Sequence, residues 1–131
     1  MTYLLDSNVV IAVLKGNRGV IEKLESLAVR DVAISALVVH ELYYGAYKSQ
    51  RRTDNLAVLD RLQFQVLDFD REDAVCAGQI RADLALMGKP IGAYDVLIAG
   101  QALNRGMTLV TRNIGEFSRV DGLTLENWDN E

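Results

Sequence analysis

Short apolar runs alternate along the chain with longer segments whose apolar residues recur at helical spacing. Apolar runs of strand length fall at residues 3–5, 32–34, 66–67 and 109–110, with a fifth candidate at 123–125. Helical periodicity covers residues 8–14, 19–27, 36–48, 53–62, 72–87 and 93–104. Strands that alternate with helices predict a parallel sheet. We therefore expect one α/β domain over residues 1–131, with a central parallel sheet of four to five strands and helices on both faces.

Polar residues mark the starts of several helical segments. Ser35 precedes the segment 36–48, and Asp70 precedes the segment 72–87. Thr53 or Asp54 is placed to start the fourth segment. Side-chain oxygens of these residue types accept hydrogen bonds from the free N–H groups of the first turn, so we expect them to cap these helices.

Three acidic residues and one amide stand where a folding argument would not place them. Asp6 ends the first apolar run and Asn113 follows the fourth, so we expect both at the edge where parallel strands end. Glu41 and Asp95 interrupt the apolar stripes of two helices. An ionised carboxylate that faces the interior costs several kcal/mol unless a cation or a hydrogen-bond donor compensates it. The arrangement therefore predicts a metal site.

The three carboxylates of Asp6, Glu41 and Asp95 are hard oxygen ligands. Such ligands suit Mg²⁺ or Mn²⁺, which also accept phosphate oxygens from a substrate. One or two ions of this kind hydrolyse phosphodiesters by activating water and stabilising the leaving oxygen, so no nucleophilic side chain is needed. This chemistry fits a chain with one histidine, one cysteine and no Gly-x-Ser-x-Gly, Gly-rich phosphate loop or paired-Cys zinc pattern.

Composition narrows the class of protein and its compartment. Of the 131 residues, 50% are hydrophobic and 24% are charged, with a single proline, which is typical of an ordered globular domain. The lone Cys76 cannot form an intramolecular disulfide, and neither a signal segment nor an apolar run near the ~18 residues of a membrane span is present. We therefore expect a cytoplasmic protein with no membrane partner. The net charge of −4 counts modestly against a nucleic-acid partner, unless bound cations supply local positive charge.

Four fragments, taken in order, resemble a known family. They are residues 6–8 (DSN), 39–45 (VHELYYG), 91–99 (IGAYDVLIA) and 111–117 (TRNIGEF). Together they resemble the PIN-domain ribonucleases, specifically the VapC toxins of bacterial type II toxin–antitoxin pairs. Each fragment alone is a weak signal, whereas four in the family's order, each in the matching strand or helix context, are specific. The resemblance covers essentially the whole chain and implies a PIN-like fold.

The resemblance assigns roles by position. It implies that Asp6 and Asp95 are catalytic metal ligands, and that Glu41 binds metal or orients the attacking water. Ser7 and Asn8 resemble the residues that hold the opening loop and its carboxylate in place.

Asn113 departs from the family, which often has Asp at this position. By resemblance Asn113 is a metal ligand through its carbonyl oxygen or a partner of a metal-bound water, but it contributes no charge. Whether Glu116 supplies the missing carboxylate is left open. Arg112 lies beside Asn113 at the expected sheet edge, so it is our candidate for contact with RNA phosphates.

The activity implied is that of a Mg²⁺- or Mn²⁺-dependent endoribonuclease that cleaves structured RNA. The RNA is often a tRNA, with initiator tRNA the specific expectation, and cleavage slows translation when the antitoxin is lost. The implied partners are a VapB-type antitoxin, which wraps a groove and often places a basic side chain near the carboxylates, and a second copy in a homodimer. Two alternatives are a PIN-like domain that binds without cutting, since Asn113 is not Asp, and a response-regulator-like domain with acids at the same edge.

Several of these residues have competing structural roles. Asp6 is a potential cap for the first helix, although Ser7 is better placed for that role, which leaves Asp6 for a metal. Asp95 is a potential first-turn acid favoured by the helix dipole, and Asn113 a potential turn residue.

Two surface features are less specific. Residues 48–52 (KSQRR) form the densest positive run, which is more often a solvated loop than a phosphate-binding patch. Tyr43, Tyr44 and Tyr47 crowd the helix of Glu41. Because they cannot all face the core, we expect some of them to suit a protein partner.

Overall fold

Five strands form one parallel sheet in the computed structural model, which describes residues 2–129. The strand order is β3-β2-β1-β4-β5. The strands are β1 (Tyr3–Leu5), β2 (Val32–Ser35), β3 (Gln65–Leu67), β4 (Thr108–Val110) and β5 (Leu125–Glu126). The predicted parallel sheet is confirmed, and the fifth strand begins two residues later than the apolar run 123–125 suggested.

The helices follow the predicted segments to within one or two residues at each end. They are α1 (Ser7–Leu14), α2 (Arg18–Glu25), α3 (Ala36–Lys48), α4 (Arg52–Asp60), α5 (Arg71–Leu86) and α6 (Ala93–Asn104). A 3-10 turn (Val29–Asp31) and a short helix, α7 (Ile114–Phe117), were not predicted. Both are too short to produce a recognisable apolar period.

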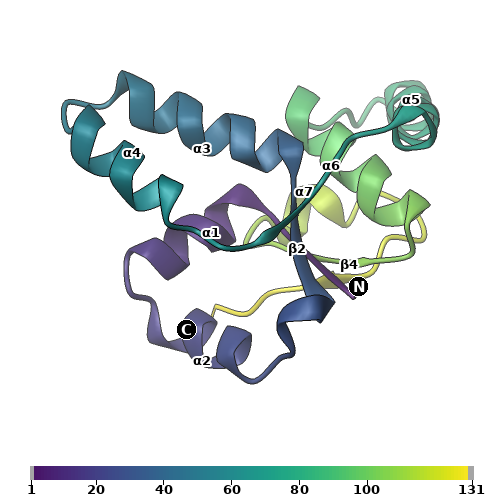
Figure 1. Ribbon diagram of the computed structural model, residues 1–131. Helices are drawn as coiled ribbons and strands as arrows, with labels where there is room; N and C mark the ends of the chain where they lie inside the picture. Colours follow the sequence, from purple (N-terminus) through teal and green to yellow (C-terminus); the bar gives the residue numbers. More distant parts are fainter. Residues whose placement is uncertain (1, 130–131) are drawn as a thin grey trace.

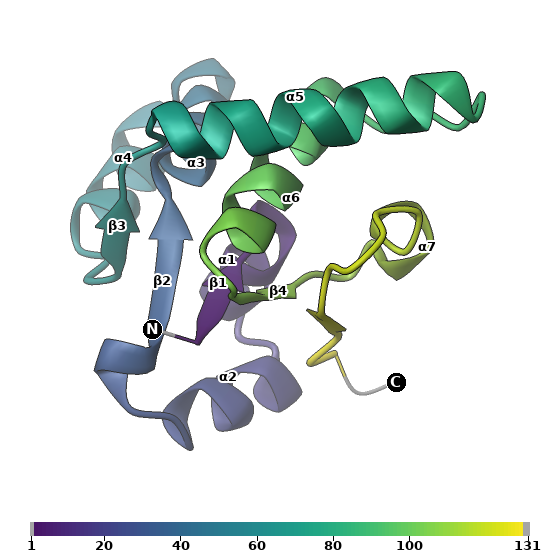
Figure 2. The ribbon, with the colours of Figure 1, turned by 90° about the vertical axis from the view of Figure 1, so that its right-hand side faces the viewer.

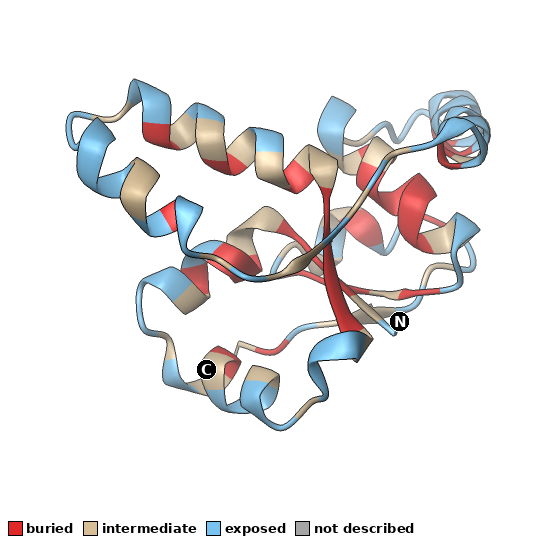
Figure 3. Cartoon of the chain, in the orientation of Figure 1, coloured by how far each residue is buried: buried red, intermediate tan, exposed pale blue. Residues whose placement is uncertain are grey.

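Helices cover both faces of the sheet. Figure 1 shows α1 to α4 on one side and α5 to α7 on the other. Figure 2 shows α5 running across the outside of α6. Strand β2, beside the central strand β1, is buried at all four positions, and burial follows the inner sides of the helices around it (Figure 3). The predicted PIN-like α/β architecture is confirmed.

Strand register brings three loops to one edge. Leu5 lies opposite Ile34 of β2 and Val110 of β4, so β1, β2 and β4 end at the same level. The residues that follow these strands therefore meet at the carboxyl edge of the sheet, the usual position of a ligand site in parallel sheets.

Helix starts agree with the sequence at two positions and differ at two. Ser35 caps α3, and Asp70 caps α5 in a reciprocal capping box with Asp73. The expected cap at Thr53 or Asp54 is wrong, because α4 already begins at Arg52 without a side-chain cap.

The expectation that Ser7 caps α1 is also wrong. Asp6 is the N-cap, with extended backbone angles (φ −73°, ψ 161°), and Ser7 is the first helical residue. Asp6 is the last extended residue after β1, so the helix begins one residue earlier than a cap at Ser7 would require. The capping bond uses one carboxylate oxygen of Asp6 and leaves the other for a second contact.

A buried cluster of hydrogen-bonded polar side chains connects helices α5 and α6. Asp73 of α5 is fully buried and accepts hydrogen bonds from Gln101 and Asn104 of α6 and from Arg105, the C-cap of that helix. Arg105 contacts both carboxylate oxygens, at 3.2 and 2.9 Å. The cluster holds α6, and with it Asp95 at the start of that helix, against the outer helix α5.

Candidate active site

Asp6 lies at the carboxyl end of β1, and its side chain is almost fully buried, at 4% exposure. Its Oδ1 accepts the backbone N–H of Ser7 at 2.8 Å, and its Oδ2 accepts the hydroxyl of Thr111 at 2.8 Å. Burial raises the pKa of Asp6, the hydrogen bonds from Thr111 and Ser7 oppose that rise, and the charge of Glu116 adds to it. Asp6 is therefore a buried acid held in one orientation by two donors.

Asn8 connects Asp6 to the loop after β4. Its Nδ2 lies 3.4 Å from both Asp6 Oδ2 and Thr111 Oγ1, and its Oδ1 accepts the backbone N–H of Arg112 at 3.3 Å. Ser7 contributes its backbone N–H to the same carboxylate. These contacts match the supporting roles that the sequence suggested for Ser7 and Asn8.

Glu41 enters the same region from α3. The side chain is partly buried, and its Oε1 is buried without a hydrogen-bond partner among residues 2–129. Burial and the charge of Asp6 raise the pKa of Glu41, and His40 lowers it. An unsatisfied buried oxygen costs about 1–3 kcal/mol, so this atom is available to a cation or a donor that enters the site.

Asp95, in the first turn of α6, and Glu116, in α7, form an acid pair beside Gly92. Burial, the hydrogen bond with Glu116 and the charges of Asp6, Glu116 and Glu41 raise the pKa of Asp95 to about 7. The pKa of Glu116 is instead lowered, first by the backbone N–H of Gly92 and then by the Asn113 amide. Of the two acids, Asp95 is therefore the one whose surroundings favour the protonated form.

Two donors fix Glu116 beside Asp95. The Gly92 N–H donates to Oε1 at 2.6 Å, and Asn113 Nδ2 donates to Oε2 at 2.9 Å. A Cβ at Gly92 would lie 3.1 Å from Asp95 Oδ2, so the lack of a side chain lets the acid pair approach the loop. The side chain of Asn113 thus holds a carboxylate, and Glu116 brings the fourth carboxylate to the site.

The four acids form one mutually repelling cluster. The charge of Asp6 raises the pKa values of Glu41 and Asp95, and the charge of Glu116 raises those of Asp6 and Asp95. Within residues 2–129, no three acidic, histidine or cysteine side chains are already arranged to enclose a metal ion. The hard oxygen donors, their repulsion and the free Glu41 oxygen nevertheless fit a divalent cation chemically.

Arg112, the candidate phosphate contact, lies at this edge in an ion pair. Its Nε is 3.1 Å from Asp129, and its side chain is 41% exposed. Asp129 also accepts a hydrogen bond from Asn17, the cap of α2, at 2.9 Å. Arg112 is thus anchored to the C-terminal segment on one side and open to solvent on the other.

Two residues of the site were missed from the sequence. Thr111 looks like the last β-branched residue of a strand, yet it is fully buried and also accepts the backbone N–H of Asn113 at 3.0 Å. Gly92 looks like a helix-start glycine, yet it binds Glu116. The available signal was their position inside the fragments that carry Asn113 and Asp95.

Known proteins of the same size and fold are similar over nearly the whole chain. The family described as "PIN domain" matches residues 3–123. A "tRNA(fMet)-specific endonuclease VapC" from Shigella flexneri is 41% identical over 130 residues, 98% of each chain. A "Ribonuclease VapC2" from Rickettsia felis is 40% identical over 133 residues, 98% of this chain and 99% of that one. A crystal structure of DNA-bound VapBC from Salmonella typhimurium superposes with a TM-score of 0.92 at 40% identity, covering 98% of both chains.

The chain has a parallel sheet with a carboxylate cluster at its carboxyl edge, and the PIN-domain family matches residues 3–123. Together these two findings define a PIN domain. The near full-length relatives narrow this class further. The chain belongs to the VapC ribonucleases of the PIN-domain family. Membership contradicts the alternative of a response-regulator-like domain. Separately, no helix among the described residues is long and apolar enough to cross a membrane.

Proposed function

We propose that this chain is a divalent-metal-dependent endoribonuclease toxin that cleaves a structured RNA. The observation that carries the proposal is the cluster of Asp6, Glu41, Asp95 and Glu116 at the carboxyl edge of the sheet, in which burial and mutual repulsion raise three of the four pKa values. A protein maintains such a cluster at a cost in stability, which a functional cation offsets. The family relationship supplies the reaction class, since its near full-length relatives are named ribonucleases.

Asp6, Glu41 and Asp95 are the proposed holders of Mg²⁺, or of Mn²⁺ as a substitute. When bound, such an ion supplies Lewis-acid chemistry by polarising water and phosphate oxygens. The Asp6 carboxylate is oriented for this role by Ser7 and Thr111. The Oε1 atom of Glu41 has no hydrogen-bond partner among the described residues, and its proposed role is to hold or orient a water at the reacting phosphate.

Glu116 is the proposed fourth acid, with Asn113 as its positioning residue. The sequence left open which of the two completes the site. The contacts favour Glu116, because Asn113 donates its amide to the Glu116 carboxylate and the charge of Glu116 helps to raise the pKa of Asp95.

The proposed substrate is tRNA, with initiator tRNA the first choice. This choice rests on the relative from Shigella flexneri, which is named for tRNA(fMet). Arg112 is the proposed phosphate contact, since it lies beside the acid cluster with 41% of its side chain exposed. The cytoplasm, where tRNA and translation are found, is the proposed compartment.

A VapB-type antitoxin is the proposed partner, in a hetero-oligomer such as those whose crystal structures superpose on this chain. A groove between α1, α3 and α4 suits it, with apolar walls from Ile11, Leu14, Leu42, Ala46, Val58 and Leu59. Glu41 also lines this groove, so the groove runs into the acid cluster. A segment that filled the groove and carried a basic residue would reach the carboxylates and neutralise them. A homodimer stays a prediction.

The decisive experiment is cleavage of total cellular RNA by the purified, antitoxin-free protein. The reactions contain Mg²⁺, Mn²⁺ or EDTA, with Asp6→Asn as the matched inactive variant, and new RNA ends are mapped by sequencing. We expect metal-dependent ends in a tRNA that are absent with EDTA and with Asp6→Asn. Binding of metal and RNA without any cleavage would overturn the nuclease proposal in favour of a non-cutting PIN-like domain.

A further inference from the structure

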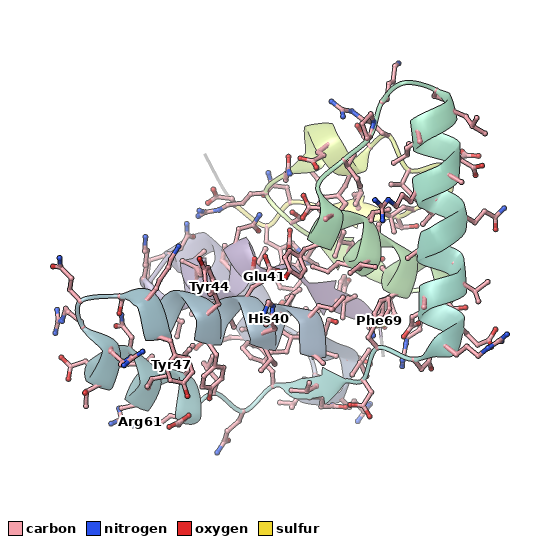
Figure 4. All side chains as sticks on the ribbon, turned by 90° about the horizontal axis from the view of Figure 1, so that it is seen from above. His40, Glu41, Tyr44, Tyr47, Arg61 and Phe69 are labelled. Carbon is pink, nitrogen blue, oxygen red and sulfur yellow. The ribbon has the colours of Figure 1, made fainter. Side chains whose placement is uncertain are left out.

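A row of aromatic side chains runs along the outer face of α3 beside the acid cluster. His40, Tyr44 and Tyr47 follow one another at i, i+4 and i+7, a spacing that places side chains on one face of a helix. All three are exposed, with Tyr44 at 60% and Tyr47 at 52%. Figure 4 shows them in succession along the helix, with Glu41 beside His40. We call His40, Tyr44 and Tyr47 the aromatic row.

The aromatic row begins at the acid cluster. The ring of His40 packs against the ring of Tyr94, with centroids 5.4 Å apart, and Tyr94 is 46% exposed. His40 directly precedes Glu41, and Tyr94 directly precedes Asp95. The His40–Tyr94 contact therefore bridges α3 and α6 next to two of the proposed metal-binding acids, and the other rings lead away from that point.

The far end of the row carries positive charge. Lys48 Nζ lies 4.8 Å from the centre of the Tyr44 ring, and the Arg52 guanidinium lies 5.3 Å from that of Tyr47. Among residues 2–129 neither cation forms an ion pair with an acid. These cations lie in the positive run 48–52 of a chain whose net charge is −4. The surface thus pairs exposed rings with local cations in an otherwise acidic protein.

We propose that the aromatic row and its cations bind a single-stranded segment of the RNA substrate that leads to or from the scissile phosphate. Exposed rings stack on unpaired bases, and neighbouring cations contact the phosphates. Four helical residues span about 6 Å, so rings at i and i+4 can serve neighbouring bases of an extended strand. The inference rests on the proposed nuclease function and deepens it by naming how the substrate is held.

The row is separate from the proposed antitoxin groove. The groove uses the face of α3 that carries Glu41, Leu42, Gly45 and Ala46, whereas the row occupies the neighbouring face. An apolar groove suits a protein segment, while exposed tyrosine and histidine rings with cations suit bases and phosphates. The sequence alone suggested a protein partner for the exposed tyrosines, and the cations at Tyr44 and Tyr47 favour RNA instead.

The test uses a short unpaired oligoribonucleotide that contains 2-aminopurine, a base whose fluorescence falls when it stacks. Binding is measured in the Asp6→Asn background, where no cleavage is expected. We expect Tyr44→Leu and Tyr47→Leu each to raise the Kd about fivefold or more and to lose the quenching, because these are typical effects of removing one stacking ring. Tyr44→Trp should retain the RNA affinity and the quenching, since it keeps an aromatic ring at the same position.

Tyr43→Leu is the matched control. It makes the same chemical change one residue away, where the tyrosine hydroxyl donates to Asp60 at 2.6 Å and ties α3 to α4. It should lower the Tm without changing the RNA affinity. The same tyrosine variants with Asp6 intact are tested for tRNA cleavage, circular dichroism and oligomeric state.

The outcomes separate this inference from the proposed function. If the protein with Asp6 intact cleaves tRNA but Tyr44→Leu and Tyr47→Leu bind and quench like the parent, the inference is wrong and the nuclease proposal stands. If the tyrosine variants change oligomeric state while RNA binding is unchanged, the row is an interface between copies of the chain and the inference is also overturned. If the protein cleaves no RNA, the nuclease proposal fails, and the inference fails with it.

Discussion

The Asn113 side-chain amide donates to Glu116 Oε2 at 2.9 Å, so an amide holds a carboxylate in place at the edge of the acid cluster. The same carboxylate accepts the Gly92 N–H and pairs with Asp95. The absence of Asp at position 113 therefore does not leave the site one acid short. Glu116 reaches the cluster from one turn further along the chain, and Asn113 keeps it there.

Glu116→Gln is expected to reduce RNA cleavage more strongly than Asn113→Ala. The first change removes the fourth carboxylate, whereas the second removes one of the donors that orient it. Loss of a supporting contact typically costs about 10–100-fold in metal affinity or activity, and we expect Asn113→Ala near the lower end. Initial cleavage rates at saturating Mn²⁺ measure both. Asn113→Ala with activity below that of Glu116→Gln would show that Asn113 acts directly on the metal or substrate.

Thr111→Val is expected to impair both activity and stability. The change keeps the side-chain shape but removes the hydroxyl that donates to buried Asp6 and accepts from the Asn113 backbone. Leaving a buried acceptor without its donor costs about 1–3 kcal/mol, and a misoriented ligand lowers activity about tenfold or more.

Urea unfolding and RNA cleavage measure the two effects of Thr111→Val. Thr111→Ser, which keeps the hydroxyl, is the control and should stay close to the parent in activity. If Thr111→Val cleaved RNA at the parental rate, the hydroxyl would have no part in positioning Asp6.

The sequence predicted the position of the site because the ends of the strands can be recognised from the apolar runs. Asp6 directly follows an apolar run, and parallel pairing of that run with residues 109–110 brings the loops after both strands to one edge. Glu41 and Asp95 were found because a carboxylate on an apolar stripe conflicts with burial. The contradiction between local pattern and residue type was the signal in each case.

The contacts around Glu116 could not be predicted from the sequence, for physical reasons. They depend on the loop before α6 meeting the four-residue helix α7, and neither segment has a periodic pattern that fixes its direction. The choice between Asp6 and Ser7 as cap turns on a backbone shift of one residue, which two adjacent polar residues do not reveal. Thr111 likewise looks like part of a strand until its buried partner is known.

Asp95→Asn is expected to stabilise the metal-free protein while abolishing cleavage. The raised pKa of Asp95, about 7, means that the folded state favours its protonated form. The native protein therefore loses stability as the pH rises from about 4 through 7. An amide avoids this loss and can still donate to Glu116.

The stability gain from Asp95→Asn should be on the order of 1 kcal/mol at pH 8, after allowance for partial solvent exposure, and should shrink towards pH 5. Urea unfolding in EDTA at several pH values measures it, with Asp121→Asn at an exposed site as the control. A destabilised Asp95→Asn protein at pH 8 would contradict the view that the acid cluster is repulsive without metal.

Asp73 makes the opposite contribution to pH-dependent stability. Burial alone would raise its pKa, but hydrogen bonds from Arg105, the Asp70 backbone and Asn104, with the charge of Arg105, lower it to about 2. A carboxyl with a lowered pKa stabilises the fold above its unfolded pKa and loses that contribution as the pH falls towards the folded value. We therefore expect about 2 kcal/mol of the stability difference between the parent and Asp73→Asn to disappear between pH 5 and pH 2.

Urea unfolding of the parent and Asp73→Asn across this pH range measures the Asp73 contribution. Arg105→Lys should weaken the same pH dependence, because a single ammonium cannot reproduce the guanidinium contacts at both carboxylate oxygens. The Asp73 cluster holds α6 against α5, and α6 carries Asp95. Asp73→Asn and Arg105→Lys should therefore lower the Tm, and each variant should retain metal-dependent cleavage at pH 7 only below its lowered Tm. A stability difference that stayed constant from pH 5 to pH 2 would show that Asp73 acts through packing alone.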